Sequence, residues 1–357
     1  MDANRSTLID AMRSGDGRAL ARAISAVENH SPGWIDLLKD IFPHTGGALT
    51  IGITGSPGAG KSTLVDQLAK LYRKKTPRVG AEASRGLRLS PGQPAENPPP
   101  TNTALGGPPE LSDNDGHRTI GIIAVDPTSP YSGGAILGDR IRMQDHFSDP
   151  GIYIRSMATR GSLGGLARAT ADVSLVLDAS GRDIVMIETV GVGQDEVDIV
   201  RVADVTVVIL VPGMGDDVQS IKAGIMEIAD VFVINKSDHE GAERVEKEIR
   251  ALQSIAGRKD GWTPPIVKTV ATEGAGVKEL AEAIDAYGSY LRENNLLQRK
   301  RIQHWETRLL EMLRDTLLEK AQATMSDGDL ARYAADIAEH KRDPYSVIEE
   351  IAGKLRD

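Results

Sequence analysis

Short, strongly apolar runs recur from residue 48 onward, and most are separated by longer amphipathic segments. Strands that are apolar on both sides must be covered on both faces, which is typical of a mostly parallel, doubly wound sheet with helices on each side. The sequence therefore predicts an α/β fold with these runs as its strands. The runs are LTIGIT, TIGIIAV, IYIRSM, DIVMIET, VTVVILV, VFVIN and IVKTVA.

The composition narrows the class of protein further. A length of 357 residues suits one nucleotide-sized core with terminal additions, and the net charge of −9 offers no basic excess for binding nucleic acid. The absence of cysteine excludes disulfides, thiolate metal sites and cysteine nucleophiles, and is compatible with a reducing cytoplasm. Without a long apolar run or a signal-peptide pattern, we expect a cytoplasmic protein that binds neither membrane nor nucleic acid.

Three regions follow from the patterning. Residues 1–45 carry apolar positions at helical spacing and are expected to form an N-terminal helical region, and residues 46–293 hold all the predicted strands. Within that domain, residues 76–118 are rich in Pro, Gly, Ser and Asn, and are expected to be a disordered surface insertion. A plain linker is favoured over a binding segment there.

Residues 294–357 are expected to form a C-terminal helical arm. A long helix over 296–322 carries an apolar stripe, and two further helices are predicted to start near Ser326 and near Pro344. The stripe either covers the protein's own core or contacts a second copy, and the pattern alone does not decide between the two.

The stretch GSPGAGKST matches the pattern G-x-x-x-x-G-K-[ST], with an expected strand before it and a helix after it. Glycines allow backbone amides to converge on a phosphate, Lys61 can reach the β and γ phosphates, and the Ser62 hydroxyl can ligate Mg²⁺. This motif predicts a phosphate-binding loop for a nucleoside triphosphate. Its predicted nucleotide-binding residues are Gly55, Ser56, Pro57, Gly58, Ala59, Gly60, Lys61, Ser62 and Thr63.

The stretch NKSD lies at the end of another predicted strand, roughly 175 residues after the phosphate loop. The Asp238 carboxylate can accept hydrogen bonds from guanine N1 and N2, whereas adenine would leave it unpaired. Asn235 can donate toward the base or tie loops together, and Lys236 can stack along the base. The motif predicts GTP and GDP as ligands, and residues 269–277, TVATEGAGV, are expected to form the remaining loop beside the base.

Three carboxylates are candidates for a magnesium shell. Glu188 ends the run that should lie beside the strand before the phosphate loop, and Gly191 can offer its amide to the γ-phosphate. Asp126, where a strand breaks at a proline, and Asp139, in a Gly-rich stretch, could complete the shell. Helix capping by Glu188 and solvated positions for both aspartates are the alternatives. The predicted metal ligands are Ser62, Asp126, Asp139 and Glu188, and the predicted catalytic residues are Lys61, Asp126, Asp139 and Glu188.

Two further stretches bear on turnover and partners. No glutamine directly follows Gly191, since Gln194 comes three positions later, so we expect slow intrinsic hydrolysis that a partner accelerates. Residues 212–224, PGMGDDVQSIKAG, form a Gly-rich, doubly acidic stretch after an apolar strand, and we expect it to switch or to contact a partner. An ordinary connecting loop is the alternative.

Taken in order, five motifs closely resemble the P-loop GTPases of the MeaB/ArgK type. The resemblance spans nearly the whole chain and implies a GTPase chaperone that loads adenosylcobalamin into methylmalonyl-CoA mutase or a related acyl-CoA mutase, and protects it. It further implies a homodimer joined through the C-terminal arms, and a switch that contacts the mutase through Asp216, Asp217, Gln219 and Lys222. The segment at 76–118 is longer than the usual connection. The motifs are GITGSPGAGKST, AVDPTSPYSGGAILGDRIRM, IETVGVGQDEVDI, VPGMGDDVQSIKAGIMEIAD and NKSD.

Two other functions compete with this interpretation. Similar sequences have been labelled as kinases linked to arginine transport, but a phosphotransferase needs an acceptor pocket with a general base, and the sequence shows none. A nickel-insertion GTPase should carry a His-rich or Cys-containing metal site, whereas this chain has 7 scattered histidines and no cysteine.

Overall fold

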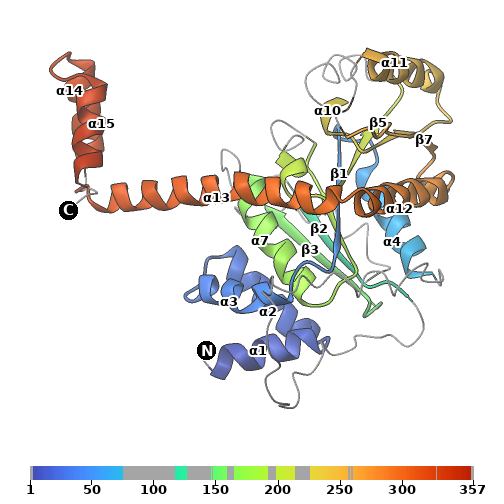
Figure 1. The fold of residues 1–357 in the computed structure, drawn as a ribbon, viewed down its shortest axis with the longest axis horizontal. Coiled ribbons are helices and arrows are strands. Elements are labelled where there is room, and N and C mark those ends of the chain that lie inside the picture. Colours follow the sequence, from blue (N-terminus) through green and yellow to red (C-terminus); the bar gives the residue numbers. More distant parts are fainter. Residues whose placement is uncertain are drawn as a thin grey trace, which may run out of the picture. The chain divides into compact units, whose positions relative to one another are not determined.

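The computed structural model describes most of the chain outside a few connecting stretches (Figure 1). The chain divides into two compact units, Met1–Leu297 and Gln298–Asp357. Nearly all of the insertion expected at 76–118 lies outside the described residues, although His117 and Arg118 at its end are described. The described residues are 3–74, 117–126, 146, 148–158, 165–191, 198–213, 226–255, 258, 260–326 and 328–354.

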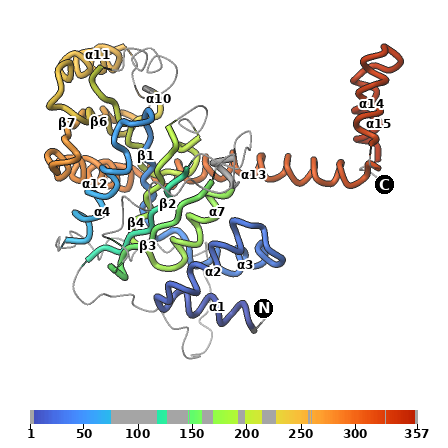
Figure 2. Tube along the Cα trace, turned by 180° about the vertical axis from the view of Figure 1, so that it is seen from behind, coloured from blue at the N-terminus to red at the C-terminus, as the bar shows by residue number. Residues whose placement is uncertain are grey.

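All seven predicted strands are present and form one sheet, in which every pairing is parallel (Figure 2). The order across the sheet is β3-β2-β4-β1-β5-β6-β7, so β1 lies between β4 and β5. Ligands of such sheets bind beyond the carboxyl ends of the strands, where the strand order reverses. The strands are β1 (Leu49–Gly55), β2 (Ile120–Asp126), β3 (Ile152–Ala158), β4 (Ile184–Glu188), β5 (Val205–Leu210), β6 (Val231–Asn235) and β7 (Ile266–Thr269).

Helices cover both faces of the sheet, as the apolar strands predicted. Among the described residues, no helix combines the length and the apolar character needed to cross a membrane. The helical segments of the first unit are α1 (Ala3–Arg13), α2 (Gly17–Glu28), α3 (Trp34–Ile41), η1 (Phe42–His44), α4 (Lys61–Arg73), α7 (Gly165–Ala179), η3 (Ile199–Arg201), α10 (Met226–Ile228), α11 (Ala242–Ile255) and α12 (Val277–Glu293).

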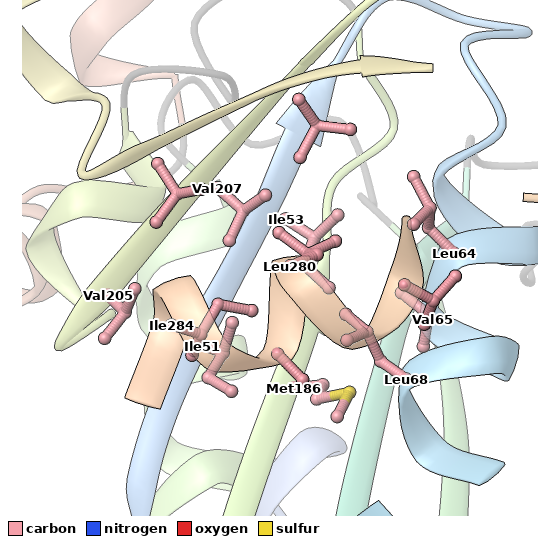
Figure 3. Close-up of a cluster of buried hydrophobic side chains, with 14 of the residues drawn as sticks. Ile51, Ile53, Leu64, Val65, Leu68, Met186, Val205, Val207, Leu280 and Ile284 are labelled. Carbon is pink, nitrogen blue, oxygen red and sulfur yellow. The ribbon is translucent and has the colours of Figure 1, made fainter. Parts of the chain in front are cut away.

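One face of the sheet packs against α4 and α12. Figure 3 shows Leu64 and Leu68 of α4 gathered with Leu280 and Ile284 of α12 over Ile51 of β1, and all five side chains are buried. Burying one such side chain contributes about 1.5–3 kcal/mol. The helix that follows the phosphate loop is therefore fixed to the sheet by its whole apolar side.

The opposite face packs against the N-terminal helices and α7, with α11 covering its far end. The first turn of α2 is capped by Asp16, whose carboxylate accepts from the amides of Arg18 (2.7 Å) and Ala19 (3.2 Å). These hydrogen bonds hold the pKa of Asp16 below its ordinary value. The predicted N-terminal helices thus add a second layer to the α/β core.

The amino end of the sheet carries a repeated contact between neighbouring strands. Each of three aspartates stands directly before a strand, donates its amide to the carbonyl of a threonine at the amino end of the adjacent strand, and accepts that threonine's amide with its carboxylate. The six hydrogen bonds are 2.7–3.1 Å long. The pairs are Asp183 with Thr119, Asp204 with Thr50, and Asp230 with Thr206.

The second unit is helical. It contains most of α13 (Leu296–Ala323), together with α14 (Asp329–Ala338) and α15 (Pro344–Gly353), which agree with the predicted helices. The buried Tyr333 of α14 donates its hydroxyl to Glu350 of α15 at 2.7 Å, and Arg342 donates to the same carboxylate at 2.6 Å. No residue of α13 is buried, and Leu309 in its apolar stripe is 59% exposed.

Candidate nucleotide-binding site

Three polar side chains end neighbouring parts of the sheet at its carboxyl edge. Asp126, Glu188 and Asn235 are the last residues of β2, β4 and β6, and all three are buried. The core beneath α4 and α12 includes Met186 and Val233, two positions before Glu188 and Asn235, and Ile122, four positions before Asp126. Because side chains alternate along a strand, the three polar groups lie on the face that α4 covers.

The phosphate loop connects β1 to α4 as the motif predicted. Lys61 begins α4, is 6% exposed, and donates its Nζ to the carbonyl oxygens of Gly55 (2.7 Å) and Ser56 (3.0 Å). The amides of the first helical turn lack intrahelical partners, so the loop and the helix start together offer donors to an anion. The lysine ammonium is therefore held at the loop where a phosphate group would be neutralised.

Gly191 lies against the same loop. Its φ is +88°, and a Cβ built on it would overlap the Gly55 carbonyl oxygen and lie 2.5 Å from Lys61 Nζ. Just before it, the Thr189 amide donates to Ile53 O at 3.0 Å, which fixes the chain after β4 against β1. The close approach needs glycine, and it brings the backbone expected to face the γ-phosphate beside the phosphate loop.

The strand of Glu188 lies beside β1, as predicted. Ser62 Oγ donates to Glu188 Oε1 at 2.6 Å, which joins the serine of the phosphate loop to this carboxylate. A hydroxyl and buried carboxylates are the hard oxygen donors that Mg²⁺ prefers, so the residues present fit this ion. Within the described parts of the chain, no cluster of three or more His, Cys, Asp or Glu could hold a metal.

Asn235 connects the phosphate loop to the loop after β7. Its Nδ2 donates to Ala59 O at 2.8 Å, while its Oδ1 accepts from Thr269 Oγ1 (3.0 Å) and from the Ala271 amide (3.1 Å). Of the two roles that the sequence left open for this asparagine, the structure shows the tie between loops. A Cβ on Gly60 would overlap Nδ2, so the glycine permits the contact.

The rest of the NKSD motif borders the same loop. Lys236 adopts φ +55° and donates its Nζ to Gly58 O at 3.0 Å. The Asp238 side chain is 53% exposed and lies 3.8 Å from His239 Nε2, so its carboxylate is accessible to a ligand. Phosphate loop and base-reading motif therefore adjoin one another at one edge of the sheet.

Several predicted residues fall outside the described parts of the chain. They include the third candidate for the magnesium shell, the predicted partner switch, and the displaced glutamine: Asp139, Asp216, Asp217, Gln219, Lys222 and Gln194. Conversely, the sequence named the 269–277 loop without singling out Thr269 and Ala271 as the residues that Asn235 holds. The sequence marked these two residues only by their position at the end of the last predicted strand.

A parallel sheet whose central strand runs through G-x-x-x-x-G-K-[ST] into a helix, with a carboxylate on the adjacent strand bound to the serine of that loop, defines a P-loop nucleoside triphosphatase. More narrowly, the chain belongs to the family described as methylmalonyl Co-A mutase-associated GTPase MeaB, whose family model matches residues 20–84 and 110–326. The chain is thus a GTPase that binds guanine nucleotides, and the resemblance drawn from its motifs is confirmed.

Named relatives agree with this family. The chain is 44% identical over 353 residues to a putative GTPase of Pyrococcus abyssi, covering 97% of this chain and 96% of that protein. It is 30% identical to the mitochondrial methylmalonic aciduria type A homolog of Caenorhabditis elegans, covering 90% and 75%. The crystal structure of a LAO/AO transport system kinase superposes with a TM-score of 0.67 at 25% identity, covering 100% and 99%.

Proposed function

We propose that the chain is a GTP-hydrolysing chaperone that gates the loading of adenosylcobalamin into an acyl-CoA mutase of the methylmalonyl-CoA mutase type, and protects that mutase. The observation that carries the nucleotide part is the Asn235 side chain, which binds the phosphate loop at Ala59 and the base-side loop at Ala271. Both ends of one nucleotide are thereby served by a single connected site. The mutase part is supported by the family description and by the name of the relative from C. elegans.

In this proposal the phosphate loop binds the phosphates of GTP. Lys61 exchanges its carbonyl partners for β and γ phosphate oxygens, since an ammonium gains more from an anion than from neutral carbonyls. The Gly191 amide faces the γ-phosphate, and Asp238 accepts from guanine N1 and N2. Asn235 and Lys236 hold the loops in place around the base.

Magnesium would be held by Ser62, Glu188 and Asp126, with Asp139 as a further ligand. Such an ion would neutralise charge on the phosphates of the nucleotide. The Ser62 oxygen would ligate the ion through a lone pair, which leaves the hydrogen bond to Glu188 in place because that bond uses the hydroxyl proton. Glu188 would supply the negative charge that holds the ion beside Ser62.

Turnover is proposed to be slow in the isolated protein and to rise on contact with the mutase. We assign the mutase contact to the acidic switch with Asp216, Asp217, Gln219 and Lys222, and we propose a cytoplasmic homodimer. The exposed apolar side chains of α13 supply a surface for a second copy, because Leu309, Leu313 and Leu317 are each about half exposed and recur at helical spacing.

The test measures GTP turnover by the full chain with and without an acyl-CoA mutase. We expect a severalfold rise with the mutase, and we expect changes at Asp216 and Lys222 to blunt the rise while leaving basal hydrolysis intact. Asp238→Asn should shift binding from guanine to xanthine nucleotides, since an amide matches the xanthine edge. Unaltered GTP affinity in this variant would remove the base assignment.

A phosphotransferase is the competing function, because the superposed crystal structure is titled a transport system kinase. The same assay separates the two. Label transferred from ATP to a protein or small-molecule acceptor, with no response to the mutase, would favour the kinase. Release of inorganic phosphate from GTP and not from ATP, at a higher rate when the mutase is added, would favour the chaperone.

A further inference from the structure

A buried histidine joins the helix of the phosphate loop to the chain that leads into β3. His146 is 5% exposed, and its Nε2 donates to Asp66 Oδ1 at 2.8 Å. The other oxygen of Asp66 accepts from Lys70 Nζ at 2.9 Å. A buried carboxylate held from two sides is a directional contact, because each donor fixes one of its oxygens.

The same stretch of chain contacts α4 a second time. His146 O accepts from the Asp149 amide at 3.0 Å, and the Asp149 carboxylate accepts from Arg73 Nε (2.8 Å) and Nη2 (2.7 Å). Hydrogen bonds from Arg73 hold the pKa of Asp149 below its ordinary value, so this carboxylate is ionised near neutrality. His146 and Asp149 are therefore tied to α4 in its middle, at Asp66, and at its end, at Arg73.

All the residues of α4 in these contacts lie on one stripe of the helix that also carries Ser62. Ser62, Asp66, Lys70 and Arg73 follow one another at intervals of four, four and three residues. Asp66 is about one helical turn from Ser62, roughly 6 Å along the axis, whereas Arg73 is about 16 Å away. Any rotation of α4 about its axis would move the Ser62 hydroxyl away from Glu188, and His146 opposes this rotation at the nearest turn.

We propose that His146 is a positioning residue for the magnesium end of the site, because its contact with Asp66 fixes the direction of the Ser62 hydroxyl. The inference rests on the proposed role of Ser62 as a magnesium ligand. A variant without the imidazole should still bind the phosphates and the base of the nucleotide, but it should need a higher Mg²⁺ concentration to bind them tightly.

The experiment titrates GDP into the full chain by calorimetry at a series of Mg²⁺ concentrations, without any turnover. We expect His146→Ala to raise the half-saturating Mg²⁺ concentration at least about fivefold, on the scale of one lost hydrogen bond. His146→Gln should restore most of the wild-type value, since its amide can donate to Asp66. Asp149→Asn is the matched control, because it weakens the tie at the far end of α4, and it should leave the Mg²⁺ requirement unchanged.

The outcomes separate this inference from the proposed function. If the wild-type protein takes up no GDP at any Mg²⁺ concentration, the proposed nucleotide site fails. If wild type binds and His146→Ala shows the Mg²⁺ requirement of Asp149→Asn, the positioning role is overturned while the site stands. It is also overturned if His146→Gln behaves like His146→Ala. His146→Leu, which fills the space of the imidazole without a donor, makes the same test should His146→Ala not fold.

Discussion

Replacing Asn235 by alanine tests whether one side chain holds the two halves of the nucleotide site together. The change removes the hydrogen bond to Ala59 O and those from Thr269 Oγ1 and the Ala271 amide, at a position that is 2% exposed. Each buried hydrogen bond contributes about 0.5–1.5 kcal/mol, so the free energy of unfolding should fall by about 2–4 kcal/mol. The affinity for Mg·GDP should also fall by tenfold or more, since both loops must then be ordered by the ligand.

Two matched variants divide this effect. Thr269→Val removes one hydroxyl with little change in volume, and should cost about 1 kcal/mol with a small effect on GDP binding. Asn235→Asp keeps the acceptor for Thr269 but faces Ala59 O with a carboxylate oxygen, so it should weaken GDP binding more than Thr269→Val does. Urea unfolding followed by circular dichroism gives the stability, and calorimetry gives the affinity.

One pair of results would contradict this role of Asn235. If Asn235→Ala unfolds at the same urea concentration as Thr269→Val and binds Mg·GDP as tightly as wild type, Asn235 does not join the loops in solution. If the variant loses stability but not affinity, Asn235 stabilises the fold without contributing to nucleotide binding.

The remaining predictions use other parts of the fold. Asp204→Ala should lower the free energy of unfolding by about 1–3 kcal/mol, because the Thr50 amide loses its side-chain acceptor. Asp204→Asn keeps an acceptor and should lose less stability, so equal losses of the two variants in urea unfolding would contradict this. Gly191→Ala places a Cβ at positive φ against Gly55 O, so it should weaken the binding of a non-hydrolysable GTP analogue more than the binding of GDP. Calorimetry measures both affinities. Hydrogen bonds from Tyr333 and Arg342 lower the pKa of Glu350 from 4.5 to about 2, so its stabilisation is present above pH 4.5 and is lost as the pH falls toward 2. Thermal melts of Glu350→Gln should then decline less over that range than those of wild type, and parallel declines would argue against it.

The strands and the two nucleotide motifs could be predicted because they are local. Apolar runs such as those ending at Glu188 and Asn235 show their strand character over five to seven residues, and the phosphate loop carries its own flanking strand and helix. The position of Glu188 beside the phosphate loop followed from the general order of strands in this class.

Two other contacts between distant segments could not be predicted, because no motif marks them. Asn235 meets Ala59 across 176 residues, and His146 meets Asp66 across 80, so neither pair leaves a pattern within a window of sequence. A buried histidine also looks like any other single histidine until its partner is placed. The sequence could name the groups at the site, whereas the structure was needed to show what holds them.

The aspartate–threonine pairs at the amino end of the sheet have a consequence for how freely the other end can change. A parallel sheet has no hairpin turns to set the alignment of its strands, and a slip by one residue would turn every side chain to the wrong face. Asp183, Asp204 and Asp230 fix the stagger between three pairs of neighbouring strands, at the end of the sheet opposite the nucleotide loops. Loops at the carboxyl end can therefore be exchanged or lengthened for a new partner, while the aspartate–threonine pairs at the amino end keep the strands aligned.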